Sequence, residues 1–157
     1  MTIRRVPVVA AALLDSQRRV LLTQRPEGSH LAGTWEFPGG KREPEEGDRD
    51  ALQRELSEEL GVAADIGPLV AELEHRYDDF VVHLRLFAGV IRSGAPRALE
   101  VADLRWVEMD RIRELEMPPA DGPLIEALDR FIRSGRDPRG DPAPTGAPGA
   151  GGADTLR

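Results

Sequence analysis

The chain has 157 residues, which is the length of one ordinary domain, with 4% aromatic residues and a formal net charge of −7. The acidic balance argues against a nucleic-acid-binding surface, and no apolar run approaches the roughly 20 residues of a membrane span. The absence of cysteine excludes disulfides, thiolate nucleophiles and cysteine-zinc sites, and it fits the cytoplasmic location that we expect.

Two apolar segments open the chain and predict two strands, Val6–Leu14 and Arg19–Gln24, joined by the polar turn 15–18 as a hairpin. Arg4 and Arg5 followed by an apolar run also imitate a secretory signal. Pro7 interrupts that run, however, and no small-residue cleavage site follows it. A buried strand is therefore the preferred interpretation.

Arg25 follows the second strand directly, as either a solvent-facing arginine or a clamp for phosphate oxygens. A loop over 26–34 comes next, and its His30 is expected to face solvent. The segment Trp35–Lys41 predicts a short strand, with Trp35 and Phe37 packing on opposite faces.

The stretch 39–62, GGKREPEEGDRDALQRELSEELGV, predicts a helix over 48–60 with one apolar stripe, formed by Leu52, Leu56 and Leu60. Asp48 is a candidate N-cap. Gly61 stands where a C-terminal cap needs a positive φ, and Gly39 and Gly40 allow the backbone to approach an ion or phosphate closely.

Three glutamates share the helix face beside that stripe: Glu55, Glu58 and Glu59. Like charges at this spacing repel, so the cluster is either a solvated acidic face or a site for a hard divalent cation such as Mg²⁺. Arg54 is expected to pair with Glu46 and fix the preceding loop against the helix.

The remaining chain predicts strands over 66–76, 80–92 and 104–107, with a turn at 77–79 between the first two. A short helix over 109–115 capped by Asp110, a rigid loop over 118–123 and an amphipathic helix over 124–133 follow. Residues 135–157 are rich in Gly, Pro and Ala, so we expect one domain over 1–134 and a disordered tail over 135–157 without a catalytic role.

Nine residues match the spacing G-x5-E-x7-R-E-U-x-E-E-x-G-U, where U is a bulky aliphatic residue, and thereby resemble the Nudix box. They are Gly40, Glu46, Arg54, Glu55, Leu56, Glu58, Glu59, Gly61 and Val62. The resemblance implies an α/β/α sandwich with a mixed sheet between helices. It also implies hydrolysis of a nucleoside diphosphate derivative with bound Mg²⁺, Mn²⁺ being a possible substitute.

By the same resemblance, Glu55, Glu58 and Glu59 hold the metal, with the Gly39 carbonyl as a further ligand. Glu55 is the preferred general base, and Arg54 orients Glu55 or Glu46. The resemblance gives Gly40, Glu46 and Gly61 structural roles in the box. Glu100, six residues before a tryptophan, is either another metal-contacting acid or a solvated loop residue.

The chain from the first strand to Phe131 resembles Nudix hydrolases of the MutT type, which cleave nucleoside triphosphates to a monophosphate and pyrophosphate. This implies sanitation of the nucleotide pool, linked to DNA repair, with a small nucleotide as substrate and a monomer or homodimer as the assembly. Where these relatives carry a base-reading asparagine, this chain has Asp121, which is otherwise a cap for the last helix.

An ionised Asp121 accepts hydrogen bonds only and suits the exocyclic amine of cytosine, whereas a protonated one suits an oxidised guanine such as that of 8-oxo-dGTP. Phe37, Tyr77 and Phe80 are candidates to stack on the base, although Phe37 also suits the core. The alternatives are hydrolysis of coenzyme A, dinucleotide polyphosphates or ADP-ribose, and a catalytically silent nucleotide-binding Nudix domain.

Overall fold

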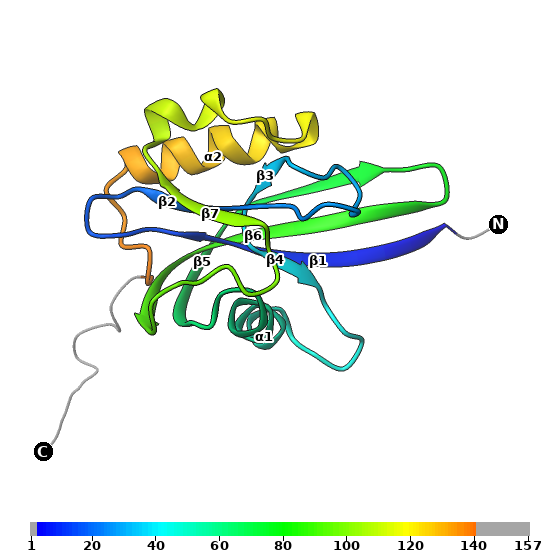
Figure 1. The fold of residues 1–157 in the computed structure, drawn as a ribbon, viewed down its shortest axis with the longest axis horizontal. Helices are drawn as coiled ribbons and strands as arrows, with labels where there is room; N and C mark the ends of the chain where they lie inside the picture. The colour runs from blue at the N-terminus through cyan, green and yellow to red at the C-terminus, as the bar shows by residue number, and fades with distance from the viewer. Residues whose placement is uncertain (1–2, 141–157) are drawn as a thin grey trace, which may run out of the picture.

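Two β-sheets lie between two helices in the computed structural model, which describes residues 3–140 (Figure 1). The first sheet has the order β4-β1-β6-β5 and the second the order β3-β2-β7. The strands are β1 Arg4–Leu13, β2 Val20–Gln24, β3 Trp35–Glu36, β4 Gly39–Lys41, β5 Ala63–Arg76, β6 Phe80–Ser93 and β7 Asp103–Val107. The helices are α1 Asp48–Leu60 and α2 Gly122–Arg133, and the 3₁₀ turns are η1 Met109–Glu114 and η2 Pro119–Asp121.

Strand β1 is the centre of the first sheet, because it pairs parallel with β6 on one side and antiparallel with β4 on the other. Its side chains alternate between two cores. Ala10 and Ala12 pack on the α2 side, whereas Val9, Ala11 and Leu13 pack on the α1 side. A strand buried on both faces reads as a continuous apolar run, which confirms a strand rather than a signal segment.

The predicted hairpin of the first two strands is wrong. Apart from one isolated bridge between Leu14 and Val20, β1 and β2 belong to different sheets, and β2 pairs with β3 and β7 instead. The turn is short enough for a hairpin, but both strands are apolar on both faces. Each therefore gains more by pairing inside its own sheet.

Helix α1 begins and ends at the predicted residues, with Gly61 as C-cap at φ 71°. The predicted caps of Asp48 and Asp110 are wrong, because Gly47 and Glu108 occupy the N-cap positions. Asp48 instead accepts hydrogen bonds from Arg42 at 3.0 Å and Arg85 at 2.5 Å. Helix α2 covers the opposite face of the first sheet (Figure 1).

Trp35 and Phe37 do not pack on opposite faces, as expected, but lie in the same core on the α2 side. The strand is interrupted after Glu36, so the chain leaves one sheet at β3 and enters the other at β4. That crossing breaks the two-residue alternation on which the expectation rested.

The predicted division at residue 134 stays a prediction. Residues 135–140 are described, and Pro138 lies against Gly67 of β5 while Arg18 donates to the Arg136 carbonyl at 3.2 Å. The rest of the expected tail, 141–157, lies outside the described residues. Within residues 3–140, no helix has the length and hydropathy of a membrane span.

Candidate active site

Arg54 connects the box loop to the acidic face of α1. Its guanidinium donates to Glu46 at 2.6 and 2.9 Å, to Glu55 at 3.1 Å and to Glu58 at 3.2 Å. The Arg54 hydrogen bonds and one from the Glu43 amide lower the pKa of Glu46 to about 2. The predicted Arg54–Glu46 pair is confirmed, and the same side chain also orients Glu55.

Glu59 has no arginine partner and lies deeper than Glu58. Its carboxylate accepts a hydrogen bond from the Gly39 amide at 3.2 Å. Burial, and next the charge of Glu55, raise its pKa to about 8. Burial also raises the pKa of Glu55, whereas the hydrogen bond and the charge of Arg54 lower it. Two half-buried acids with raised pKa values on one helical turn are the expected environment of a proton acceptor or a cation site.

The glycines of β4 make room for these carboxylates. A Cβ on Gly40 would overlap the carboxyl group of Glu55, and a Cβ on Gly39, whose φ is 156°, would overlap the backbone of Val9. The close approach of β4 to α1 therefore requires glycine at position 40, and its close approach to β1 requires glycine at position 39.

Glu100 reaches the same end of α1 through backbone hydrogen bonds. The amides of Arg97 and Leu99 donate to the last carbonyls of the helix, those of Leu60 and Glu59, at 3.0 Å each, and the Glu100 amide donates to the Glu59 carbonyl at 3.4 Å. These bonds satisfy helix-terminal carbonyls and hold the loop in place. The Glu100 charge contributes to the raised pKa of both Glu55 and Glu59, so the three acids are neighbours.

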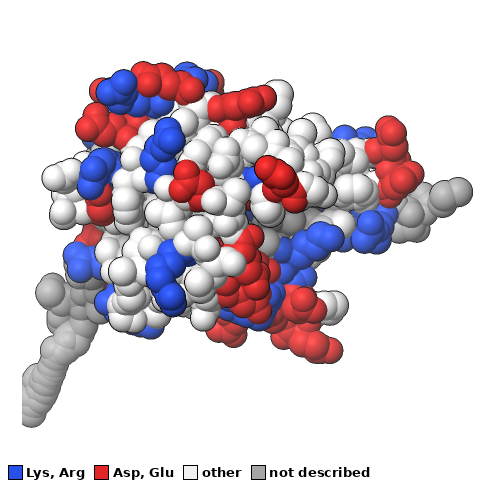
Figure 2. Space-filling model, in the orientation of Figure 1, with Lys and Arg blue, Asp and Glu red and all other residues white. Residues whose placement is uncertain are grey.

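The donor chemistry fits a hard divalent cation, since carboxylates and a glycine carbonyl are the ligands that Mg²⁺ prefers. In residues 3–140, however, no three acidic or imidazole groups converge on one point, because Arg54 draws Glu55 and Glu58 towards itself. Acidic side chains gather over α1 and the loop before it, with basic side chains beside them (Figure 2).

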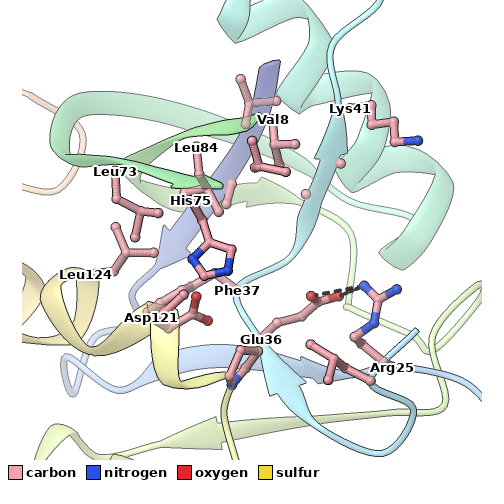
Figure 3. A pocket seen from close by; sticks show the side chains of 18 of the residues that line it. Val8, Arg25, Glu36, Phe37, Lys41, Leu73, His75, Leu84, Asp121 and Leu124 are labelled. Atoms are coloured by element: carbon pink, nitrogen blue, oxygen red, sulfur yellow. Dashed lines mark hydrogen bonds and ion pairs between the residues drawn. The ribbon is translucent and has the colours of Figure 1, made fainter. Parts of the chain in front are cut away.

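A cavity of about 270 Å³ adjoins the box on the α2 side of the first sheet (Figure 3). Gly39, Gly40 and Lys41 form the end near the box, and the η2–α2 junction forms the other. Leu73, Val82, Leu84 and Leu124 make much of its wall apolar. Such a concave, mainly apolar space with a few polar groups is typical of a small-molecule site.

Two acids lie in this cavity. Asp121 lines it and occupies the N-cap position of α2 without a side-chain capping hydrogen bond, and burial together with the charge of Glu36 raises its pKa to about 6. Burial also raises the pKa of Glu36, although Arg25 donates to both of its carboxylate oxygens at 3.2 Å. Arg25 thus lines the cavity as a partner of Glu36, an arrangement that the sequence did not predict.

Of the aromatic candidates, Phe37 and Tyr77 line the cavity, whereas Phe80 lies behind Tyr77, its ring stacked on it at 4.9 Å between centroids. Phe37 is also a core residue with 5% of its surface exposed, which confirms the core interpretation, whereas its stacking on a base stays a prediction. His30 is exposed, as expected, and it also lines the cavity.

Sequence reasoning missed three polar residues of the cavity, Glu36, Lys41 and His75. Glu36 and Lys41 lie in the segment 35–41, for which the sequence predicts a short strand but not a cavity beside it. For His75 the available signal is its spacing from Leu73 and Tyr77, because alternate residues of a strand share one face.

The arrangement of sheets and helices and the box geometry identify the class of protein. The chain belongs to the Nudix family, since the model described as the NUDIX domain matches residues 9–127. The fold is the expected α/β class, and the chain is a Nudix hydrolase that cleaves pyrophosphate bonds.

Among the relatives, a CTP pyrophosphohydrolase of Escherichia coli is 40% identical over 120 residues, covering 76% of this chain and 89% of its own length. An 8-oxo-dGTP diphosphatase of Haemophilus influenzae is 32% identical, over 78% of this chain and 90% of its own. The solution structure of the E. coli ORF135 protein superposes with a TM-score of 0.73 at 36% identity, over 84% of this chain and 94% of that one.

Proposed function

We propose that the protein hydrolyses nucleoside triphosphates to a monophosphate and pyrophosphate with Mg²⁺ or Mn²⁺, and that its preferred substrates carry cytosine. The observation that carries this proposal is the buried Asp121 carboxyl group in a cavity whose other end is formed by the box residues Gly39 and Gly40. Above its pKa of about 6, Asp121 is ionised and accepts hydrogen bonds only. The exocyclic amine of cytosine is the matching donor.

The relatives support the same substrate class. The protein that is 40% identical bears the name CTP pyrophosphohydrolase. Sanitation of the cytoplasmic nucleotide pool, as a monomer or homodimer, completes the proposal.

The chain's own residues divide the work of the reaction. Water attacks a phosphorus atom, the bridging P–O bond breaks, and pyrophosphate leaves. Glu55 or Glu59, whose pKa values are raised, takes the proton from water, and Arg54 holds Glu55 in place. Glu55, Glu58, Glu59 and Glu100 with the Gly39 carbonyl are the candidate ligands of Mg²⁺, which when bound neutralises charge on the phosphates. Arg25, released from Glu36, is a candidate phosphate contact.

A second substrate, 8-oxo-dGTP, is favoured by a specific observation. Because the pKa of Asp121 is about 6, a protonated Asp121 is accessible near neutral pH and donates a hydrogen bond to a carbonyl of an oxidised purine. The 32% identical relative of H. influenzae carries the name of that activity.

The test is turnover of CTP, dCTP, UTP, GTP, 8-oxo-dGTP, a dinucleotide polyphosphate, coenzyme A and ADP-ribose, with Mg²⁺, with Mn²⁺ and with EDTA, measured by chromatographic separation of the products, because only the nucleoside triphosphates release free pyrophosphate. We expect CTP or dCTP to give the highest kcat/KM and EDTA to abolish turnover. A preference for coenzyme A, ADP-ribose or a dinucleotide would contradict the proposal, and nucleotide binding without any turnover would indicate a silent nucleotide-binding domain.

A further inference from the structure

His75 is an imidazole on an otherwise apolar sheet face. Alternate residues of β5, Leu73, His75 and Tyr77, line the cavity, and His75 is paired in register with Val82 of β6. Val82 and Val8 of β1 line the same cavity and offer only hydrocarbon. His75 therefore places two ring nitrogens on a part of the sheet where Val82 and Val8 offer only hydrocarbon.

Packing rather than hydrogen bonding orients the His75 ring. It lies edge-on to Tyr77 at 4.6 Å between centroids, and Tyr77 in turn stacks on Phe80 at 4.9 Å with an interplanar angle of 21°. Arg4 lies over the Phe80 ring at 5.4 Å. The turn between β5 and β6 holds these rings in place, because the Tyr77 amide donates to the Phe80 carbonyl at 2.8 Å.

No side chain or backbone group within residues 3–140 forms a hydrogen bond with either nitrogen of His75. In Figure 3 the imidazole projects into the cavity from β5, with Leu84 on one side and Asp121 and Phe37 on the other. The nearest comparison is His83 on β6, which faces the other side of the sheet and is bonded to Glu72 at 2.8 Å. Within residues 3–140, both ring nitrogens of His75 therefore lack a partner, whereas Nε2 of His83 is bonded to Glu72.

We propose that His75 is a specificity-determining residue that hydrogen-bonds the edge of the nucleobase beside the group read by Asp121. This inference rests on the proposed function and deepens it. A neutral imidazole offers one N–H donor and one acceptor. On cytosine the amine donor adjoins a ring-nitrogen acceptor, so Asp121 accepts from the amine and His75 donates to the ring nitrogen or the neighbouring carbonyl.

On uracil the amine is replaced by a carbonyl oxygen, and the neighbouring ring nitrogen carries a hydrogen. Asp121 then faces an acceptor, and His75 pairs with the ring N–H only if it presents its acceptor nitrogen in place of its donor. Leaving buried polar groups unpaired in this way is a strong source of discrimination. The pair Asp121 and His75 thus selects cytosine over uracil.

The test compares His75→Phe with His83→Phe, the same exchange on the opposite sheet face. The substrates are CTP, UTP and ribose 5-triphosphate, which carries no base. We expect His75→Phe to raise KM for CTP at least tenfold with kcat within threefold, and to lower the CTP-to-UTP ratio of kcat/KM. Turnover of ribose 5-triphosphate should not change, and His83→Phe should behave like the wild type.

A second variant, His75→Gln, keeps an N–H donor and should retain part of the preference even if the phenylalanine variant does not fold. An equal loss on CTP and ribose 5-triphosphate, or an unchanged CTP-to-UTP ratio in an active His75 variant, would overturn the inference and leave the proposed function standing. A wild-type enzyme that cleaves no nucleoside triphosphate would overturn both. A wild type that cleaves UTP as well as CTP would also overturn the inference.

Discussion

One arginine changes the electrostatics expected of the box helix. The repulsion among Glu55, Glu58 and Glu59 suggested that only a dication makes the cluster tolerable, but Arg54 already pairs with the first two. Glu59 is left out of this pairing and keeps a pKa raised to about 8 by burial and by the charge of Glu55. Glu59 is therefore the carboxylate whose ionised form gains most from a bound cation.

Replacement of Glu59 or Glu58 by glutamine should lower kcat by at least about 100-fold, which corresponds to about 2.7 kcal/mol of lost transition-state stabilisation. The two variants should differ in stability. Without metal and above the Glu59 pKa of about 8, Glu59→Gln removes a half-buried charge and should raise Tm, whereas Glu58 is 47% exposed and its replacement should leave Tm nearly unchanged. Steady-state kinetics and thermal unfolding in EDTA measure the two effects. Wild-type rates in both variants would end the metal-site hypothesis.

Base selection should depend on pH through Asp121. Burial, and then the charge of Glu36, raise its pKa from 3.8 to about 6, so Asp121 is an acceptor above pH 6 and becomes protonated below it. KM for CTP should therefore rise as the pH falls from about 7 to 5. In Asp121→Asn, which does not titrate, this part of the pH dependence should be lost.

Dividing KM of the wild type by KM of Asp121→Asn at each pH cancels the titration of the triphosphate, of Glu36 and of other shared groups. The quotient should increase towards low pH with a midpoint near 6. A flat quotient would exclude Asp121 as the base-reading acceptor.

Among the helices and strands, the sequence predicts correctly the features that depend on residues close together in the chain. The bounds of α1 follow from its leucine stripe and from Gly61, whose positive φ ends the helix. Strand partners are set by distant segments, which is why the expected β1–β2 hairpin is wrong and β1 lies between β4 and β6. No local signal in the first 24 residues distinguishes these pairings.

The candidate site also has a part that the sequence predicts, the box, and a part that it does not, the cavity. The box residues follow from the sequence because they are close together at fixed spacing, whereas the cavity is assembled from five strands, helix α2 and several connecting segments. Glu36 and His75 meet there only because β3 and β5 belong to different sheets that border one space. Their roles depend on tertiary neighbours, and the sequence supplies only the face that each side chain occupies.

The contact between β4 and α1 yields a prediction about Gly40. In Gly40→Ala the new methyl group would overlap the Glu55 carboxyl group, which must rotate away from β4 and from Arg54. We expect kcat to fall at least tenfold, with KM for the nucleotide much less affected, because the cavity itself is preserved.

Gly47→Ala is the matched control for this exchange, since the same methyl group meets no atom within 4 Å and the backbone has φ −80°. Its kcat should equal that of the wild type, with only a small loss of Tm from the poorer N-cap. Equal kcat in the two variants would show that the Glu55 position against β4 is not needed for turnover.

In the whole molecule, β4 is the element that the two halves of the candidate site share. On the α1 side the Gly39 amide binds Glu59, and on the α2 side Gly39, Gly40 and Lys41 form the end of the cavity. A nucleotide whose base lies near Asp121 and whose phosphates lie near β4 therefore brings its anhydride bonds to the acids of α1. Under the proposed function, this three-residue strand couples base recognition to hydrolysis.

The C-terminal limit of the cooperative fold can be tested at this scale by comparing chains that end at Ser134 and Gly140 with the full chain. The chain ending at Gly140 should match the full chain in Tm and kcat. The shorter chain loses the bond from Arg18 to the Arg136 carbonyl and the packing of Pro138 on Gly67. It should be less stable by about 1–2 kcal/mol, as expected for one charged hydrogen bond near the surface, with kcat at 25 °C unchanged.

The exchange Gly67→Ala tests specifically whether residues 135–140 pack on β5. Its methyl group would overlap the backbone of Pro138, so the exchange should lower Tm of the chain ending at Gly140. In the chain ending at Ser134 the obstacle is gone, and the same exchange should be neutral or slightly stabilising, because alanine restricts the unfolded chain more than glycine does. Equal effects of Gly67→Ala in the two chains would show that 135–140 does not pack on β5 in solution. A loss of kcat on removing 141–157 alone would refute the prediction that the tail has no catalytic role.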